Sequence, residues 1–123
     1  MKLHQVAQFA SDLDRVESFY ATPFEARTLG KFDPPGLLFM QVGETRVLFE
    51  KNANSALLYF RVPDIHAEVE RPRESNVVIE TEPHVIFNDA EGAFGNAKED
   101  EWMAFFRDSE NNLVGLASRK PTA

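Results

Sequence analysis

His4 and Glu50 are the two side chains of the first half of the chain whose types could do chemistry together. His4 lies early in a strand-like segment, residues 2–10, and Glu50 lies late in another, residues 45–51. If these strands are neighbours, both side chains can enter one cleft. Imidazole and carboxylate groups bind zinc, iron, manganese or nickel, and they also form hydrogen-bonded acid–base pairs. A metal needs further ligands, which the second half would have to supply.

In the second half, residues 56–62 (ALLYFRV) form another strand-like segment. Leu57, Tyr59 and Arg61 share one face of that strand. Tyr59 can donate a hydrogen bond, and Arg61 can either hold a carboxylate or phosphate or form an ion pair at the rim. The loop 88–100 is long for a hairpin connection, and Phe94 is its only aromatic residue. We expect this loop to be a mobile lid at the mouth of a cleft.

Gly115 interrupts the second strand of an apolar hairpin, residues 101–118. A glycine inside a strand weakens the strand and leaves a hole on one of its faces. The sequence therefore raises the question of which side chain is absent from this position, and what its absence says about function.

The elements that must position these residues follow the same order twice. The first half reads strand, helix, strand, strand, strand, with Ser11 as the predicted helix cap. The second half repeats this order, with Pro72 ending its helix and Pro83 marking a break or an edge. We expect an α+β fold with two βαβββ modules, about 2–52 and 56–119, in a single domain 1–123. The modules would form a curved mixed sheet around a cleft, with the helices outside.

The composition excludes several classes of function. The chain of 123 residues carries 13 basic and 20 acidic residues, a net charge of −7, which disfavours nucleic acid and anionic membranes as partners. It has no cysteine, so disulfides, zinc–thiolate sites and cysteine nucleophiles are excluded. Neither a signal peptide nor an apolar run of membrane-spanning length is evident. We expect a cytoplasmic protein.

One motif points to a family. Phe105-Phe106-Arg107-Asp108 is followed by a turn, Asp108-Ser109-Glu110-Asn111-Asn112. With the duplicated halves, this phrase resembles the vicinal oxygen chelate superfamily, which includes glyoxalase I, extradiol dioxygenases, and fosfomycin-resistance and bleomycin-resistance proteins. The resemblance covers roughly residues 2–118. The family's turn usually reads Asp-Pro-Asp-Gly-Asn, and here Asn111 can adopt the left-handed conformation in place of glycine.

The resemblance also implies where a metal would bind. The family's metal enzymes take one ligand from the first strand and one from the last strand of each half. These positions fall on His4, Glu50, Leu57 and Gly115. Leu57 and Gly115 cannot bind a metal through their side chains, so half of the ligand set is missing.

Three interpretations of His4 and Glu50 stay open: a buried hydrogen-bonded pair, polar contacts to an organic ligand, or a weak two-ligand metal site. We expect a bleomycin-resistance-like protein that binds a small organic molecule without a cofactor. The alternative is a metal-dependent lyase, isomerase or dioxygenase using zinc, nickel, iron or manganese. The resemblance implies a homodimer. His84 is expected to be a surface or hydrogen-bonded residue, with a contact in the pocket wall as the alternative. The predicted ligand-binding residues are His4, Glu50, Leu57, Tyr59, Arg61, Phe94 and Gly115.

Overall fold

The computed structural model describes residues 3–122, which divide into two compact units. The first unit contains the chain up to Ala56 together with the turn Asp108–Asn112. The second contains Leu57–Arg107 and the residues from Leu113 onward. The sequence analysis placed the turn in the second module, whereas its contacts assign it to the first unit. That the two units form a single domain remains a prediction.

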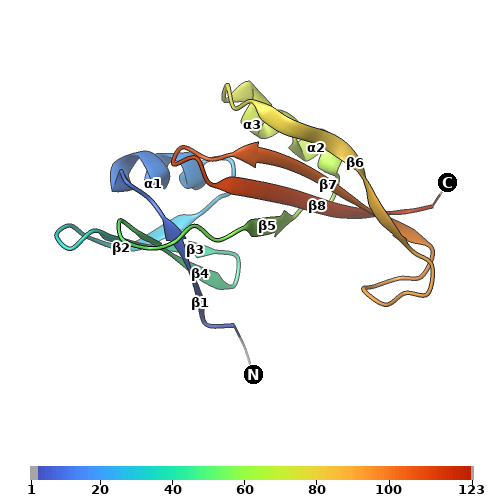
Figure 1. Cartoon of the computed structure of the whole chain (residues 1–123), viewed down its shortest axis with the longest axis horizontal. Coiled ribbons are helices and arrows are strands. Elements are labelled where there is room, and N and C mark those ends of the chain that lie inside the picture. Colours follow the sequence, from blue (N-terminus) through green and yellow to red (C-terminus); the bar gives the residue numbers. More distant parts are fainter. Residues whose placement is uncertain (1–2, 123) are drawn as a thin grey trace. The chain divides into compact units, whose positions relative to one another are not determined.

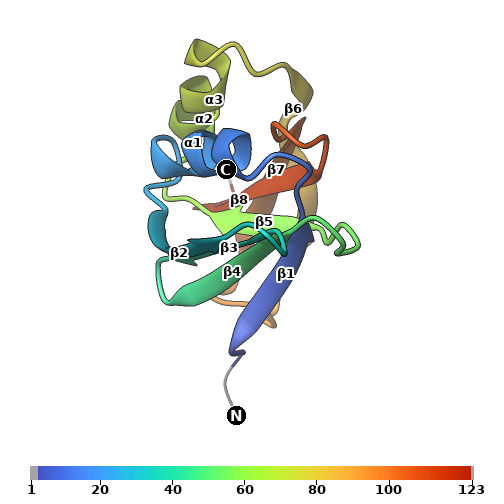
Figure 2. The same ribbon diagram turned by 90° about the vertical axis from the view of Figure 1, so that its left-hand side faces the viewer.

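The first unit is a four-stranded mixed sheet with one helix. Its strands lie in the order β1-β4-β3-β2, with β1 parallel to β4 and the other pairs antiparallel. Figure 2 shows these strands side by side with α1 beside them. Helix α1 buries Leu13, Val16 and Tyr20, which belong to the same core as Leu38 and Phe49 of the sheet. The elements are β1 (Gln5–Phe9), α1 (Leu13–Ala21), β2 (Arg27–Phe32), β3 (Leu37–Val42) and β4 (Thr45–Glu50).

The second unit repeats this arrangement, and its last three strands are longer than those of the first unit (Figure 1). Its strands lie in the equivalent order β5-β8-β7-β6, and β5 is parallel to β8. The predicted duplication of a βαβββ module is therefore confirmed. The elements are β5 (Leu58–Arg61), α2 (Ile65–Glu68), α3 (Glu70–Glu74), β6 (Ile79–Asp89), β7 (Glu99–Arg107) and β8 (Leu113–Pro121).

The two prolines of the second unit behave differently from each other. Pro83 lies in β6, the outer strand of the sheet, as the sequence predicts. Pro72 was expected to end the helix, and this is wrong, because Pro72 is buried within α3 and the helical segment is divided at Val69 instead. Pro72 is tolerated in the first turn of α3, where a backbone N–H has no partner within the helix.

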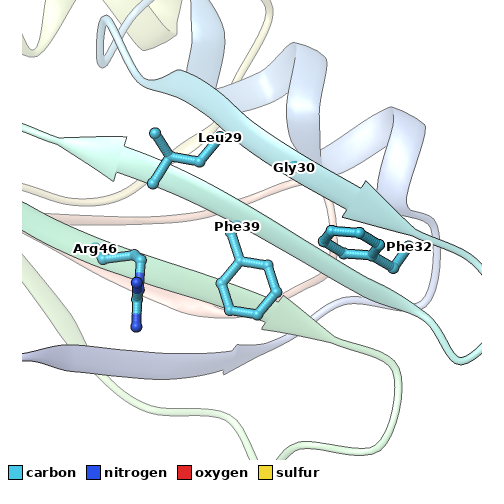
Figure 3. A pocket seen from close by; sticks show the side chains of 5 residues that line it. All are labelled: Leu29, Gly30, Phe32, Phe39 and Arg46. Atoms are coloured by element: carbon cyan, nitrogen blue, oxygen red, sulfur yellow. The ribbon is translucent and has the colours of Figure 1, made fainter.

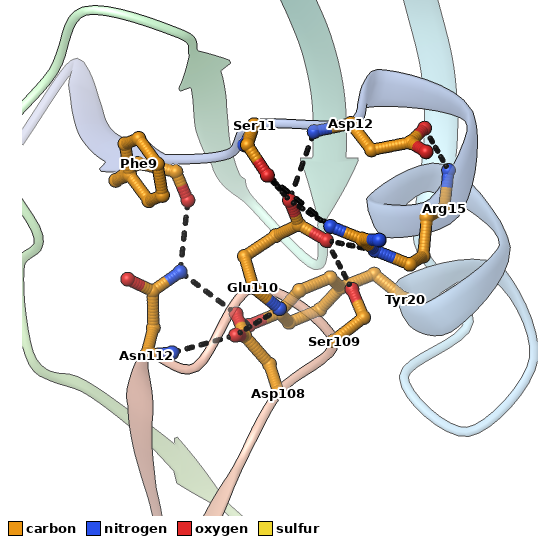
Figure 4. A network of polar contacts seen from close by, with 9 residues as sticks. All are labelled: Phe9, Ser11, Asp12, Arg15, Tyr20, Asp108, Ser109, Glu110 and Asn112. Atoms are coloured by element: carbon orange, nitrogen blue, oxygen red, sulfur yellow. Dashed lines mark hydrogen bonds and ion pairs between the residues drawn. The ribbon is translucent and has the colours of Figure 1, made fainter.

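The start of α1 corrects a second prediction. The cap is Asp12 and not Ser11: Asp12 Oδ1 accepts a hydrogen bond from the Arg15 backbone N–H at 3.0 Å. Ser11 instead donates its backbone N–H and its hydroxyl to Glu110 Oε1, at 2.8 and 2.9 Å (Figure 4). Both residues are suitable caps, and a partner 99 residues away in sequence decides which of them is used.

Glu110 has a fully buried side chain whose carboxylate also accepts hydrogen bonds from the Asp12 N–H and from Arg15 Nε, at 2.9 and 2.6 Å. Burial alone would raise the pKa of Glu110. The hydrogen bonds from Arg15, Asp12, Ser11 and Ser109 outweigh burial and lower the pKa from its ordinary 4.5 to about 2. The turn therefore contributes a buried, ionised carboxylate to the first unit.

The rest of the turn is organised by Asp108. Its carboxylate accepts hydrogen bonds from the backbone N–H groups of Glu110 and Asn112 and from the hydroxyl of Tyr20, at 2.9, 2.8 and 2.8 Å. Asn111 has φ = 65°, so it adopts the left-handed conformation predicted for it. Asn112 reaches back through its side-chain amide to the Phe9 carbonyl at 2.8 Å, which fixes the turn against β1.

Candidate functional site

One face of the second sheet carries four of the binding residues that were predicted from the second half of the sequence. Tyr59 on β5 is paired with Gly115 on β8, and Gly115 is paired with Phe105 on β7. Arg61 follows two residues after Tyr59 and therefore lies on the same face. Leu57 immediately precedes β5, and with Tyr59 it lines one cavity. Strand alternation thus placed these residues together correctly.

Gly115 is covered by two aromatic rings. A Cβ atom at this position would lie 2.8 Å from Cδ1 of Tyr59 and 3.1 Å from Cε1 of Phe105. The two rings meet edge to face, with centroids 6.1 Å apart and planes at 78°. The ring of Tyr59 therefore lies over Gly115 and fills the space that a side chain of residue 115 would need.

Two cavities share Tyr59 as a wall. The first, of about 300 Å³, is lined by apolar residues, among them Leu57, Phe105 and Leu113, and by the ion pair of Arg107 with Glu80. The second, of about 260 Å³, is lined by Tyr59, Arg61, Phe94, Glu101, Ala117, Ser118 and Arg119. Four of the predicted residues, namely Leu57, Tyr59, Arg61 and Phe94, therefore line cavities, and Gly115 forms the floor beneath Tyr59.

Arg119 is a buried residue of the second cavity, and hydrogen bonds fix the position of its guanidinium. Its side chain is 8% exposed, Nε donates to Glu99 at 3.1 Å, and Nη2 donates to Asp89 at 2.7 Å and to the Asn96 carbonyl at 3.0 Å. Gly95 lies against the guanidinium, since a Cβ there would be 3.2 Å from Nε. The hydrogen bonds that Arg119 donates to Asp89 and Glu99 raise the pKa of Arg119, so this guanidinium stays charged.

The loop that carries Phe94 is anchored at its base. Both oxygens of Asp89 accept backbone hydrogen bonds, from Ala93 at 2.8 Å and from Phe94 at 2.9 Å. Phe94 itself is 74% exposed and meets Phe87 edge to face, with centroids 5.3 Å apart. The sequence predicts a mobile lid here, whereas these hydrogen bonds favour an ordered loop that presents Phe94 to the second cavity. The mobility of the loop stays a prediction.

The first unit has its own cavity, of about 230 Å³, on its sheet (Figure 3). Leu29, Gly30 and Phe32 come from β2, Phe39 from β3 and Arg46 from β4. The Arg46 guanidinium lies over the Phe39 ring, 5.6 Å from its centroid. No residue of this cavity was predicted from the sequence.

His4 and Glu50 are not brought together. Glu50 is paired with Phe9 at the end of β1, whereas His4 precedes β1 at its start. Five residues of strand separate the two positions, a distance of about 16 Å. His4 Nε2 lies 2.6 Å from Nη2 of Arg46, and because arginine only donates, the neutral imidazole accepts this hydrogen bond. The predicted His4–Glu50 pair is therefore not formed.

The four positions carried over from the metal enzymes do not fit a metal ion. Within residues 3–122, no group of three or more His, Cys, Asp or Glu side chains is close enough to hold one. His4 faces a guanidinium, whose charge opposes a cation, and Leu57 and Gly115 offer no donor atoms. His84 is exposed on β6, with Nδ1 3.0 Å from the Glu82 carbonyl, so its predicted place on the surface is confirmed.

Two charged residues of the second cavity were missed by the sequence analysis. Glu101 and Arg119 are paired in the register of β7 and β8, on the face of Gly115 and Ala117. Alternation along the segment 113–119 would have indicated Arg119, since it lies an even number of residues from Gly115. Glu101 could not be found this way, because its place depends on the register between two strands.

Comparison with known proteins identifies the fold. No protein-family model and no curated protein sequence matches the chain. A lactoylglutathione lyase from Agrobacterium tumefaciens is 20% identical, with a TM-score of 0.69 over 95% of this chain and 92% of that chain. A glyoxalase/bleomycin resistance protein/dioxygenase from Alicyclobacillus acidocaldarius is 14% identical, with a TM-score of 0.67 over 95% and 90%. The fosfomycin resistance protein FosX from Listeria monocytogenes is 16% identical, with a TM-score of 0.69 over 94% and 88%.

Proposed function

We propose that this chain, which has the fold of the vicinal oxygen chelate superfamily, binds a small organic molecule without a metal ion. The observation that carries the proposal is the covering of Gly115 by Tyr59 and Phe105. Where the resemblance implies a carboxylate ligand, this chain has an aromatic surface beside two cavities. Tyr59, Leu57 and Phe94 are large apolar side chains that stay exposed there, which is typical of a binding surface.

The ligand that suits this surface has a flat apolar body. Rings prefer edge-to-face or offset contact with other rings, and Tyr59 and Phe94 offer such contacts to one molecule in the second cavity. Arg61 has no ion pair with any other residue of the described part of the chain, so its guanidinium is free for an acceptor group on the ligand. The proposed binding site is therefore aromatic with a cationic rim.

The dye 1-anilinonaphthalene-8-sulfonate is a suitable probe, because it combines aromatic rings with an anionic group. We expect saturable binding that is unchanged by EDTA and about tenfold weaker in Tyr59→Ala, since an aromatic contact contributes about 1.5 kcal/mol. Phe32→Ala is the matched control: Phe32 is 54% exposed, Tyr59 is 53% exposed, and Phe32 lies on the other sheet. Dye fluorescence titration measures both variants.

Two results would contradict the proposal. An equal or larger loss of affinity in Phe32→Ala would assign dye binding to the first unit. Loss of binding in EDTA, restored by zinc, nickel, iron or manganese, would favour the alternative of a metal-dependent lyase, isomerase or dioxygenase. We include this alternative because one protein with this fold is a lactoylglutathione lyase.

We also propose a homodimer, as the resemblance implies. Each sheet has outer strands, and β6 exposes Val85 and Ile86, each 43% exposed, along such an edge. An exposed apolar strand edge favours pairing with another chain, and lysine on an edge opposes it. We expect light scattering after size exclusion to give twice the chain mass of 13.9 kDa, and Val85→Lys to shift the mass toward one chain. A monomeric wild type would refute the dimer.

Within residues 3–122 no helix is long and apolar enough to span a membrane.

A further inference from the structure

Arg119 and Glu101 form an unusual pair at the wall of the second cavity. Arg119 Nη1 is buried and donates no hydrogen bond to the described residues. Glu101 Oε2 lies 3.7 Å away, within range for charge attraction but beyond hydrogen-bond distance. The Glu101 side chain is 18% exposed, and its carboxylate accepts no hydrogen bond within residues 3–122. A donor and an acceptor thus lie side by side as an ion pair, and neither makes a hydrogen bond to a residue that the structure describes.

The other bonds of Arg119 keep this donor in place. Nε and Nη2 are held by Glu99 and Asp89, and Asp89 is fixed in turn by the backbone of the Phe94 loop. The guanidinium is planar, so these bonds also fix the direction of Nη1. An unsatisfied buried donor costs about 1–3 kcal/mol, which a ligand acceptor would recover.

We infer that Arg119 and Glu101 recognise the amide edge of an aromatic ligand. This inference rests on the proposed function and names the ligand class for its second cavity. An amide carbonyl would accept from Arg119 Nη1, and the adjacent amide N–H would donate to Glu101. The ring of the ligand would lie between Tyr59 and Phe94, which line the same cavity.

The charges around the site disfavour the related ligand classes. A carboxylate in place of the amide would face Glu101 and lie near Asp89 and Glu99, which already surround Arg119. An ammonium group would face Arg119 and Arg61 and could accept no hydrogen bond from Nη1. An amide offers both a donor and an acceptor and carries no net charge, so it is the group that satisfies both partners.

Three probes of nearly equal shape test the inference: benzamide, benzoate and benzylamine. We expect two-dimensional NMR titration of the wild type to show benzamide binding at least about fivefold tighter than the other two, as one recovered hydrogen bond of about 1 kcal/mol requires. The Arg119 Nε–H and the backbone amides of Phe94 and Ala117 should shift on binding. This ranking needs no variant and so does not depend on a mutant folding.

Two variants then locate the acceptor. Glu101→Leu should weaken benzamide about fivefold and remove its advantage over benzoate. The matched control is Asp100→Asn, because Asp100 precedes Glu101 in β7, lies on the opposite face of the strand and is outside the cavity lining. This variant should bind benzamide within twofold of the wild type. An equal effect of both variants would overturn the assignment to Glu101.

The outcomes separate this inference from the proposed function. If the dye binds and benzamide shows no preference over benzoate and benzylamine, the amide edge is refuted while small-molecule binding stands. The amide edge is likewise refuted, and small-molecule binding stands, if benzamide shifts only the NMR signals of residues that line the cavity of about 300 Å³, such as Leu57, Thr81 and Leu113. If neither the dye nor benzamide binds, both proposals are refuted.

Discussion

Glu110→Gln should destabilise the protein by about 3 kcal/mol at pH 7, which is a large share of the usual free energy of unfolding of a protein. The variant keeps the shape of the side chain but replaces one carboxylate oxygen by an NH2 group. In the place of Oε1 that group would face the donors of Ser11 and Asp12, and in the place of Oε2 it would face Arg15 Nε (Figure 4). Urea unfolding followed by circular dichroism measures the loss.

Glu80→Gln is the matched control for this prediction. Glu80 also binds an arginine, Arg107, at 3.0 Å, but the two side chains are 48% and 46% exposed. An exposed ion pair contributes less than about 1 kcal/mol, since water screens it. A similar loss of stability in both variants would mean that the buried carboxylate of Glu110 stabilises the protein no more than an exposed one.

The stability difference between the wild type and Glu110→Gln should also depend on pH. Folding lowers the pKa of Glu110 from 4.5 to about 2, because its hydrogen bonds outweigh its burial. A carboxyl group with a lowered pKa stabilises the folded state above its unfolded pKa, and this contribution is lost as the pH falls toward the folded pKa. The difference should therefore be constant from pH 7 to 5 and shrink below 4.5. A difference that persists unchanged to pH 2.5 would contradict this.

The parts of the fold that are local in sequence could be predicted. Alternation with a period of two fixes which residues of one strand share a face, so Leu57, Tyr59 and Arg61 were correctly grouped. The duplication followed from the repeated order of elements, and the left-handed Asn111 followed from its place in the turn. None of these predictions needed to know how one strand is aligned with another.

The parts that depend on register could not be predicted. His4 and Glu50 lie on neighbouring strands, as expected, but the parallel pairing of β1 with β4 sets them at opposite ends. Glu101 and Arg119 are brought opposite each other by the register of β7 and β8. A shift of register moves every such pair, and residue types alone do not determine it.

Gly115→Ala should weaken dye binding about tenfold, because its new Cβ would lie 2.8 Å from the ring of Tyr59. Tyr59 is half exposed and can turn away, so the alanine should displace the ring and thereby remove the wall shared by the two cavities. The contact with Phe105 at 3.1 Å is also too close, and such crowding costs about 1–2 kcal/mol of stability.

A double-mutant cycle with Tyr59→Ala tests this cause. With the ring absent, Gly115→Ala should no longer weaken the residual dye binding. Its cost in stability should fall to about zero, because only the contact with Phe105 remains and the advantage of alanine over glycine in a strand offsets it. Gly30→Ala is the matched control: its Cβ would lie 3.0 Å from the exposed ring of Phe32 in the first unit, so it should displace that ring and leave dye binding unchanged. Additive effects of Gly115→Ala and Tyr59→Ala on binding would show that the ring of Tyr59 is not what the glycine accommodates. Non-additive effects would explain why a carboxylate at residue 115 is incompatible with this binding surface, because any side chain there would compete with Tyr59 for the same space.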